Sequence, residues 1–99
     1  MAKQKSKKVT EEVTIIYRKL GKEKAYGIAN HHTNTIEIDS RIVGKKHLEI
    51  LMHEGAHILL PEMNEEGIVR LSTALTRLLW EEGYRRIDNR DILPLQDER

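Results

Sequence analysis

The sequence predicts an α+β fold, in which a small antiparallel β-sheet of about three strands packs against two helices. Two observations lead to this prediction. Apolar residues alternate within short β-branched runs over the first 40 residues, and from Lys46 onward they recur at the three- and four-residue steps of helices. The chain of 99 residues shows no internal repeat and no second region of different composition, so we expect a single small domain.

Three short segments are expected to form the strands. Residues 11–20 are rich in β-branched residues, which favours a first strand. The segments 25–32 and 35–40 follow, and the short polar pair Thr33–Asn34 separates them. In the last segment, two isoleucines alternate with acidic residues. Alternation on either side of a short polar turn is typical of a β-hairpin.

Two helices are expected after the hairpin. The first runs from Lys46 to Pro61, where the proline ends it, and apolar side chains surround it so fully that it should lie at the centre of the fold. Asn64 is a suitable N-cap for the second helix, which should run to about Glu82 and end at Gly83. Its expected buried residues are Ile68, Leu71, Leu75, Leu78 and Leu79.

Composition excludes several classes of protein. The chain has no cysteine, which excludes disulfides, thiol catalysis and thiolate metal sites. No apolar run approaches the roughly 20 residues of a membrane span, and no apolar segment follows the first lysines as it would in a secretory signal. We therefore expect a cytoplasmic protein without a membrane partner.

The two ends differ from the central part of the chain. Residues 1–10 carry four lysines and no acidic residue, which predicts a basic disordered tail. An arm that contacts nucleic acid is the alternative, although no aromatic residue is interleaved with the lysines. Residues 89–99 are weakly patterned and are expected to form a weakly structured tail, so the folded domain should cover residues 11–88.

The first helix contains the polar pattern HExxH, formed by His53, Glu54 and His57. Residues four apart lie on one face of a helix, so both histidines can bind one cation. In zinc peptidases with this pattern, the glutamate takes a proton from the metal-activated water and passes it to the leaving amine. A buried, unpaired carboxylate is costly, and a metal ion removes that cost. The pattern therefore predicts a Zn²⁺ site with two histidine ligands and Glu54 as the general base.

A third metal ligand is expected from a carboxylate, because no histidine follows His57. Glu62 comes too soon after the helix-ending proline to fold back easily. Glu65 and Glu66 open the second helix, which must pack on the first. Glu65 lies three residues before Ile68, nearer the expected buried face, and is favoured, while Glu66 remains a candidate. The one that does not bind metal is expected only to complement the helix dipole.

The other three histidines have smaller expected roles. His31 and His32 fall at the end of the second predicted strand, just before the turn. They are interpreted first as solvent-exposed turn residues, and polarisation of a substrate carbonyl is the alternative. His47 stands at the start of the first helix and is expected at the surface.

With these features the chain resembles the zincin metallopeptidases, and more narrowly the compact HExxH proteins of bacterial and phage genomes, related in outline to SprT-like and ImmA/IrrE-type peptidases. The resemblance covers Tyr26 to Tyr84 and rests on HHTNTIEIDSR, LEILMHEGAHILLPEMNEE and LLWEEGYR. It implies a minimal zincin architecture with a gluzincin-like site, in which a hairpin edge strand holds an extended substrate by strand addition. The chain departs from the SprT-like pattern by lacking a downstream histidine, and from larger gluzincins by its short spacing between His57 and Glu65.

Two functions are consistent with the sequence. The first is a zinc-dependent metallopeptidase, expected to be an endopeptidase that acts on a peptide or protein. The alternative is a zinc-stabilised, non-catalytic interaction module, with nucleic acid as a partner through the lysine-rich N-terminus. A purely structural zinc site has no use for a general base, so Glu54 favours the enzyme.

Overall fold

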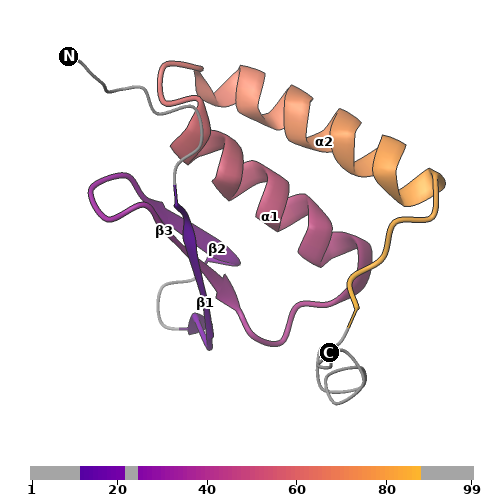
Figure 1. The fold of residues 1–99 in the computed structure, drawn as a ribbon, viewed down its shortest axis with the longest axis horizontal. Coiled ribbons are helices and arrows are strands. Elements are labelled where there is room, and N and C mark those ends of the chain that lie inside the picture. Colours follow the sequence, from indigo (N-terminus) through magenta and orange to yellow (C-terminus); the bar gives the residue numbers. More distant parts are fainter. Residues whose placement is uncertain (1–11, 22–24, 88–99) are drawn as a thin grey trace, which may run out of the picture.

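A computed structural model describes residues 12–21 and 25–87 of the chain. Its elements are β1 (Thr14–Arg18), β2 (Gly27–Asn30), β3 (Thr35–Asp39), α1 (Gly44–Leu59) and α2 (Glu65–Glu81). Figure 1 shows α1 between the sheet and α2, so the HExxH helix is the central element of the fold. The expected α+β fold is confirmed. The two predicted tails, 1–10 and 89–99, lie outside the described residues.

The sheet is mixed, whereas the sequence predicted antiparallel pairing throughout. The strand order is β1-β3-β2; β2 pairs with β3 antiparallel, and β1 pairs with β3 parallel. The β2–β3 hairpin therefore formed as expected, and only the position of β1 differs from the prediction. If β1 lay next to β2, the three strands would form an antiparallel meander. Because β1 lies next to β3 instead, it runs parallel to its neighbour. This arrangement leaves β2 at an edge of the sheet, against α1.

The turn between β2 and β3 is built by asparagines. The side chain of Asn30 accepts hydrogen bonds from the backbone N–H of His32 at 2.9 Å and of Thr33 at 3.4 Å. Asn34 adopts a positive φ of 53°, a conformation that asparagine tolerates better than most residues. The turn thus fixes the register in which Ile36 pairs with Ala29.

The core between sheet and helices is small and aliphatic. Ile36 and Ile38 of β3 pack against Ile58 of α1, and Leu20 and Ile68 are also fully buried. With so few large buried side chains, each contributes a substantial part of the hydrophobic stabilisation, on the order of 1.5–3 kcal/mol.

The predicted limits of α2 are confirmed, and one of its expected core residues is not. Asn64 caps the helix by accepting a hydrogen bond from Gly67 N–H at 2.8 Å, and Gly83 follows the helix with a φ of +99°. Leu78 was expected in the core but is 58% exposed. The buried face of α2 contains Ser72 and Thr76, and Leu78 lies at the edge of the apolar stripe that the sequence predicted to be buried.

Asp39, at the end of β3, ties the loop after β1 to the loop before α1. Its buried carboxylate accepts a hydrogen bond from Leu20 N–H at 3.2 Å. It also accepts hydrogen bonds from the backbone N–H of Arg41 at 2.9 Å and from the guanidinium of Arg41 at 2.7 Å. These donors, first of all the Arg41 side chain, hold the pKa of Asp39 well below its ordinary value. The carboxylate therefore stays ionised in spite of its burial.

Candidate metal centre

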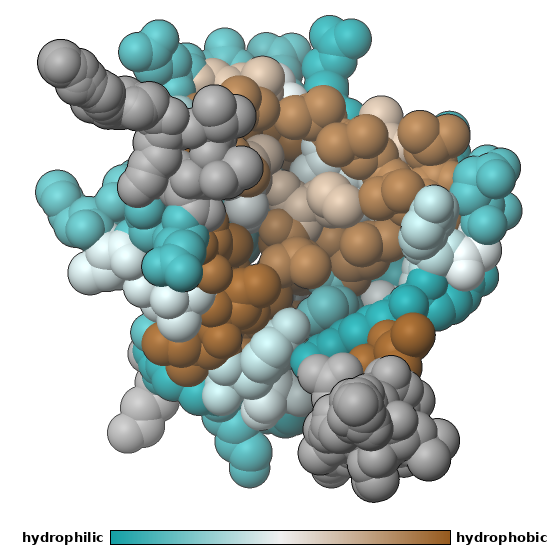
Figure 2. Space-filling model, viewed as in Figure 1, coloured by the Kyte–Doolittle hydropathy of each residue, from teal (hydrophilic) through white to brown (hydrophobic). Residues whose placement is uncertain are grey.

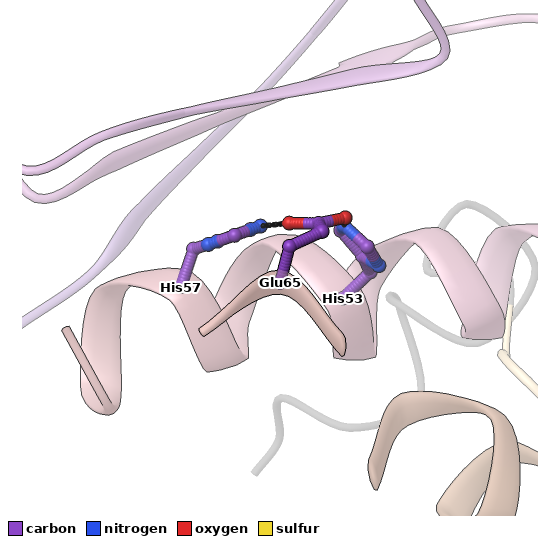
Figure 3. A group of neighbouring side chains, drawn as sticks. All are labelled: His53, His57 and Glu65. Carbon is purple, nitrogen blue, oxygen red and sulfur yellow. Dashed lines mark ion pairs between the residues drawn. The ribbon is translucent and has the colours of Figure 1, made fainter. Parts of the chain in front are cut away.

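Three potential metal ligands converge where the N-terminus of α2 meets α1. The Nε2 atoms of His53 and His57 lie 3.3 Å and 3.0 Å from the two carboxylate oxygens of Glu65. Figure 3 shows the two imidazole rings and the carboxylate on the same side of α1, with Glu65 reaching over from α2. All the ligand atoms lie within 4.8 Å of one another. The two histidines are partly buried and Glu65 is exposed, so the cluster is open to solvent on one side.

These residues fit a zinc ion in number and chemistry. Imidazole nitrogen and carboxylate oxygen bind zinc at about 2.0–2.2 Å, which places tetrahedral ligand atoms about 3.3 Å apart. The contacts of 3.0 and 3.3 Å run to different oxygens of Glu65, and one potential ligand atom from each residue lies within 4.8 Å of the other two, so the three side chains can converge on one ion. Three protein ligands leave a fourth position for water or substrate, as in catalytic rather than structural zinc sites.

Glu65, and not Glu66, joins this cluster. Both begin α2, yet the group of potential ligands among the described residues contains Glu65 and omits Glu66. The turn after Pro61, which the hydrogen bond from Met63 N–H to Leu60 O closes at 3.0 Å, directs the first residue of α2 toward α1. Of the two candidate carboxylates, the structure therefore brings Glu65 to the two histidines.

Glu54 lies beside the potential ligands, and its side chain is partly buried. Burial raises the pKa of its carboxyl, and the nearby histidines act in the opposite direction. The wall that buries it is the backbone of β2. A Cβ added to Gly27 would stand 3.0 Å from Glu54 Cγ and 2.6 Å from Ile50 Cγ2, so β2 and α1 are in contact here without an intervening side chain. The expected general base is thus held between the metal cluster and a strand.

That strand has its outer edge next to Glu54, and among the described residues no strand pairs with this edge. Asp39 N–H donates to Tyr26 O at 2.9 Å, which makes these two residues a hydrogen-bonded pair of the β2–β3 ladder. Hydrogen-bonded pairs alternate along antiparallel strands, so the N–H and C=O groups of Gly27 and Ala29 face away from β3. Because β2 is an edge strand, these groups are available to another extended chain.

The remaining histidines lie elsewhere. His31 and His32 are exposed in the hairpin turn, and neither belongs to the cluster of potential ligands. His47 was expected at the surface, and this is wrong: it is 5% exposed. Its Nε2 is 2.9 Å from the hydroxyl of Tyr17, and the two rings stack at 5.8 Å. The parallel β1 carries Tyr17 over the first turn of α1 and buries the histidine there.

Gly27 is the residue of the site that sequence reasoning missed. The segment 25–32 did contain a signal, since Gly27 and Ala29 are the small residues that alternate with larger ones. Small residues on one face of a strand mark a close approach of another backbone or helix. In the structure that face is the one against α1.

Comparison with known proteins adds no identification: no family model matches the chain, and neither a curated protein nor a solved structure matches it. Within residues 12–21 and 25–87, no helix combines the length and apolar character that crossing a membrane requires.

Proposed function

We propose that the protein is a zinc-dependent peptidase whose metal is held by His53, His57 and Glu65. The observation that carries this proposal is the position of Glu54, which stands next to the potential ligands yet is not one of them. A structural zinc site needs no partly buried carboxylate at that place. A hydrolytic site needs a base there.

The chain's own residues divide the chemistry among them. Bound zinc would act as a Lewis acid that lowers the pKa of a coordinated water toward about 7. Glu54 accepts a proton from the attacking water as its oxygen bonds to the peptide carbonyl carbon. When the C–N bond breaks, Glu54 returns that proton to the departing amine, and the products are a carboxylate and a free amine. Burial raises the pKa of the Glu54 carboxyl in the metal-free chain, which is the direction that suits a proton acceptor.

The substrate that suits this site is an extended peptide. The backbone groups of Gly27 and Ala29 that face away from β3 lie near Glu54, and an added strand would hydrogen-bond to them. Such contacts are made by backbone and not by side chains. They therefore favour recognition of unfolded or loosely folded segments over recognition of a particular residue.

The test compares three full-length variants loaded with zinc. Glu54→Gln should keep one equivalent of zinc by metal analysis and lose peptide cleavage by at least about 100-fold, because general-base catalysis is worth that much. Glu65→Gln should weaken zinc binding by more than about tenfold, since a ligand matters at least as much as the groups that orient it. Glu66→Gln is the matched control, one residue away at the same helix end, and should resemble the unaltered protein in both measurements.

Two results would contradict the proposal. One is a protein that binds zinc at one equivalent but cleaves nothing in a broad library of unfolded peptides, and this outcome supports the non-catalytic zinc module instead. The other is a protein that binds no zinc even after reconstitution, which would exclude both functions. Equal effects of the Glu65 and Glu66 substitutions on zinc affinity would contradict the assigned ligand set.

A further inference from the structure

The edge of the sheet opposite β2 is formed by β1. The strand order β1-β3-β2 places β3 on one side of β1, and within residues 12–21 and 25–87 no strand pairs with its other side. All five residues of β1 are exposed, and Ile15, Ile16 and Tyr17 are large hydrophobic residues that are 40%, 41% and 37% exposed. This edge does not belong to the metal site, because the strand beside Glu54 is β2.

β1 lacks the features that usually keep an edge strand from pairing. Natural edges are protected by proline, by lysine or by a bulge that twists the edge away. The strand TIIYR contains neither proline nor lysine, and it pairs with β3 over all five residues without a bulge. It is also held in place, since the hydroxyl of Tyr17 lies 2.9 Å from His47 Nε2. The edge is therefore a regular and ordered template for another strand.

The pairing with β3 determines which backbone groups of β1 point outward. Thr14 N–H donates to Asn34 O at 3.0 Å. Backbone groups of successive residues point to opposite sides of a strand, so every second residue counted from Thr14 turns its N–H and C=O toward β3. The groups of Ile15 and Tyr17 lie between these and therefore point to the outer edge. Each of the two residues offers one donor and one acceptor there.

We infer that β1 pairs antiparallel with β1 of a second copy of the chain, about a two-fold axis at Ile16. In this register Ile15 of each copy stands opposite Tyr17 of the other, so the outward groups of both residues meet as two hydrogen-bonded pairs. Ile16 meets Ile16 of the second copy between them, as a non-hydrogen-bonded pair. All five residues of β1 are then paired, whereas a two-fold axis at Ile15 or at Tyr17 would pair only three of them.

The side chains on both faces of this pairing fit together. On the face toward the helices, Tyr17 of the second copy lies beside Ile15, which lines an apolar hollow of about 360 Å³ together with residues of α1 and α2. Aromatic and β-branched residues opposite each other form a stabilising cross-strand pair. On the other face, Ile16 covers its counterpart, and Arg18, the only charged residue of β1, stands opposite Thr14. Like charges therefore do not face each other across the paired strands.

A second copy satisfies this edge and closes the assembly. The contact uses the same surface on both partners, so association ends at a dimer and does not continue into a filament. Figure 2 shows hydrophobic residues over β1 and, next to it, over α1 and α2, which is the side where the second copy adds its strand. The joined sheet has the order β2-β3-β1-β1-β3-β2, so both β2 edges stay outside the contact. The inference is independent of zinc and of peptide cleavage.

The first experiment uses single cysteines, because the native sequence contains none. Ile16→Cys and Ile15→Cys are compared in the full-length chain, at adjacent positions that are 41% and 40% exposed. In the inferred dimer, the two copies of position 16 face each other with Cα atoms about 4.5 Å apart, within reach of a disulfide. The two copies of position 15 are one strand across and two residues along, more than about 8 Å apart, which is beyond that reach.

Pairing about Ile16 predicts that Ile16→Cys forms a disulfide-linked dimer at least about tenfold faster than Ile15→Cys under mild oxidation, followed by mass spectrometry. The unaltered protein should sediment as a dimer whose fraction rises with concentration. Equal rates, or faster linkage of Ile15→Cys, would overturn the register. A monomer at every concentration would overturn the dimer and leave this edge to another segment of the chain or to a strand of a different protein.

A second experiment compares two variants without cysteine. Ile16→Lys places like charges opposite each other at the two-fold axis, so it should raise the dissociation constant of the dimer by at least about tenfold. Leu78→Lys is the matched control, because Leu78 is also a large exposed hydrophobic residue but lies on α2, and the constant should not change. Both variants should keep the circular dichroism spectrum of the unaltered protein, since both positions are exposed. Equal weakening by the two substitutions would contradict pairing through β1.

Discussion

Replacement of Gly27 by alanine tests the contact between β2 and α1 that buries Glu54. The new Cβ would stand 2.6 Å from Ile50 Cγ2 and 3.0 Å from Glu54 Cγ, while ordinary carbon contacts are about 3.5–4.0 Å. The strand or the helix side chains must therefore move by roughly 1 Å. The φ of Gly27 is not in the positive range, so alanine fits the backbone and the strain comes from packing alone.

The expected magnitude follows from two opposing terms. Overpacking of this kind costs about 1–3 kcal/mol, and the reduced entropy of the unfolded chain returns about 0.4–1 kcal/mol. We expect Gly27→Ala to lower the free energy of unfolding by about 0.5–2 kcal/mol in urea titration. Zinc stoichiometry should stay at one equivalent, because β2 supplies no ligand. Peptide cleavage should fall by about 10- to 100-fold, because a shift near 1 Å misplaces the base.

Gly55 provides the matched control inside the HExxH motif itself. A Cβ at Gly55 would meet Ile36 Cδ1 at 3.9 Å, an ordinary contact, and alanine in a helix interior is favoured over glycine by about 0.8–1 kcal/mol. Gly55→Ala should therefore raise the free energy of unfolding, while Gly27→Ala lowers it. If both substitutions change stability in the same direction, or if Gly27→Ala has no effect, the close approach of β2 to α1 is refuted.

Three further predictions concern stability. Because the pKa of Asp39 is depressed, the stability it confers is present above the ordinary value of 3.8 and is lost as the pH falls below it. Asp39→Asn should flatten the dependence of the unfolding midpoint on pH between about 5 and 2. Burial, with Arg86 nearby, lowers the pKa of His47, so the unfolded state binds the proton more readily and stability falls as the pH drops below about 6.5. His47→Gln should remove that slope, measured by urea midpoints at pH 5 and pH 8, and an unchanged slope would contradict the assignment. Ile68→Ala should cost about 2–5 kcal/mol, whereas Leu78→Ala should cost less than about 0.5 kcal/mol, and similar losses would refute the observed orientation of α2.

Much of the helical part of the fold could be predicted from the properties of single residues and their close neighbours in the sequence. Pro61, Asn64 and Gly83 mark helix ends by properties of the single residue, so the elements they bound were predicted closely. The proximity of His53 and His57 could also be predicted locally, because residues four apart lie on the same face of a helix. Glu65 was favoured over Glu66 from its position relative to the expected buried stripe of the second helix, and the structure brings Glu65 to the two histidines.

The errors arose where partners far apart in sequence decide the outcome. The direction of β1 depends on which edge of the hairpin it joins, and both edges accept the same alternating pattern. The pairing of β1 with β3 also brings Tyr17 over His47 and buries it. One long-range pairing therefore accounts for two errors, the direction of β1 and the burial of His47. The exposure of Leu78 is a smaller error of the same kind. The way α2 packs on α1 decides which side of the apolar stripe of α2 becomes buried.

The potential ligands all lie within residues 53–65, a single helix–turn–helix stretch, whereas the wall around Glu54 comes from a strand some 25 residues earlier in the chain. On the proposed function, affinity for metal and competence for hydrolysis would therefore have separate structural origins. In that case, substitutions of the potential ligands should weaken both zinc binding and hydrolysis, whereas Gly27→Ala in the sheet should reduce hydrolysis and leave the zinc stoichiometry unchanged. If the protein is the proposed peptidase, a change at one strand would remove catalysis and leave the ion in place, so only a short step would separate an enzyme from a metal-stabilised module.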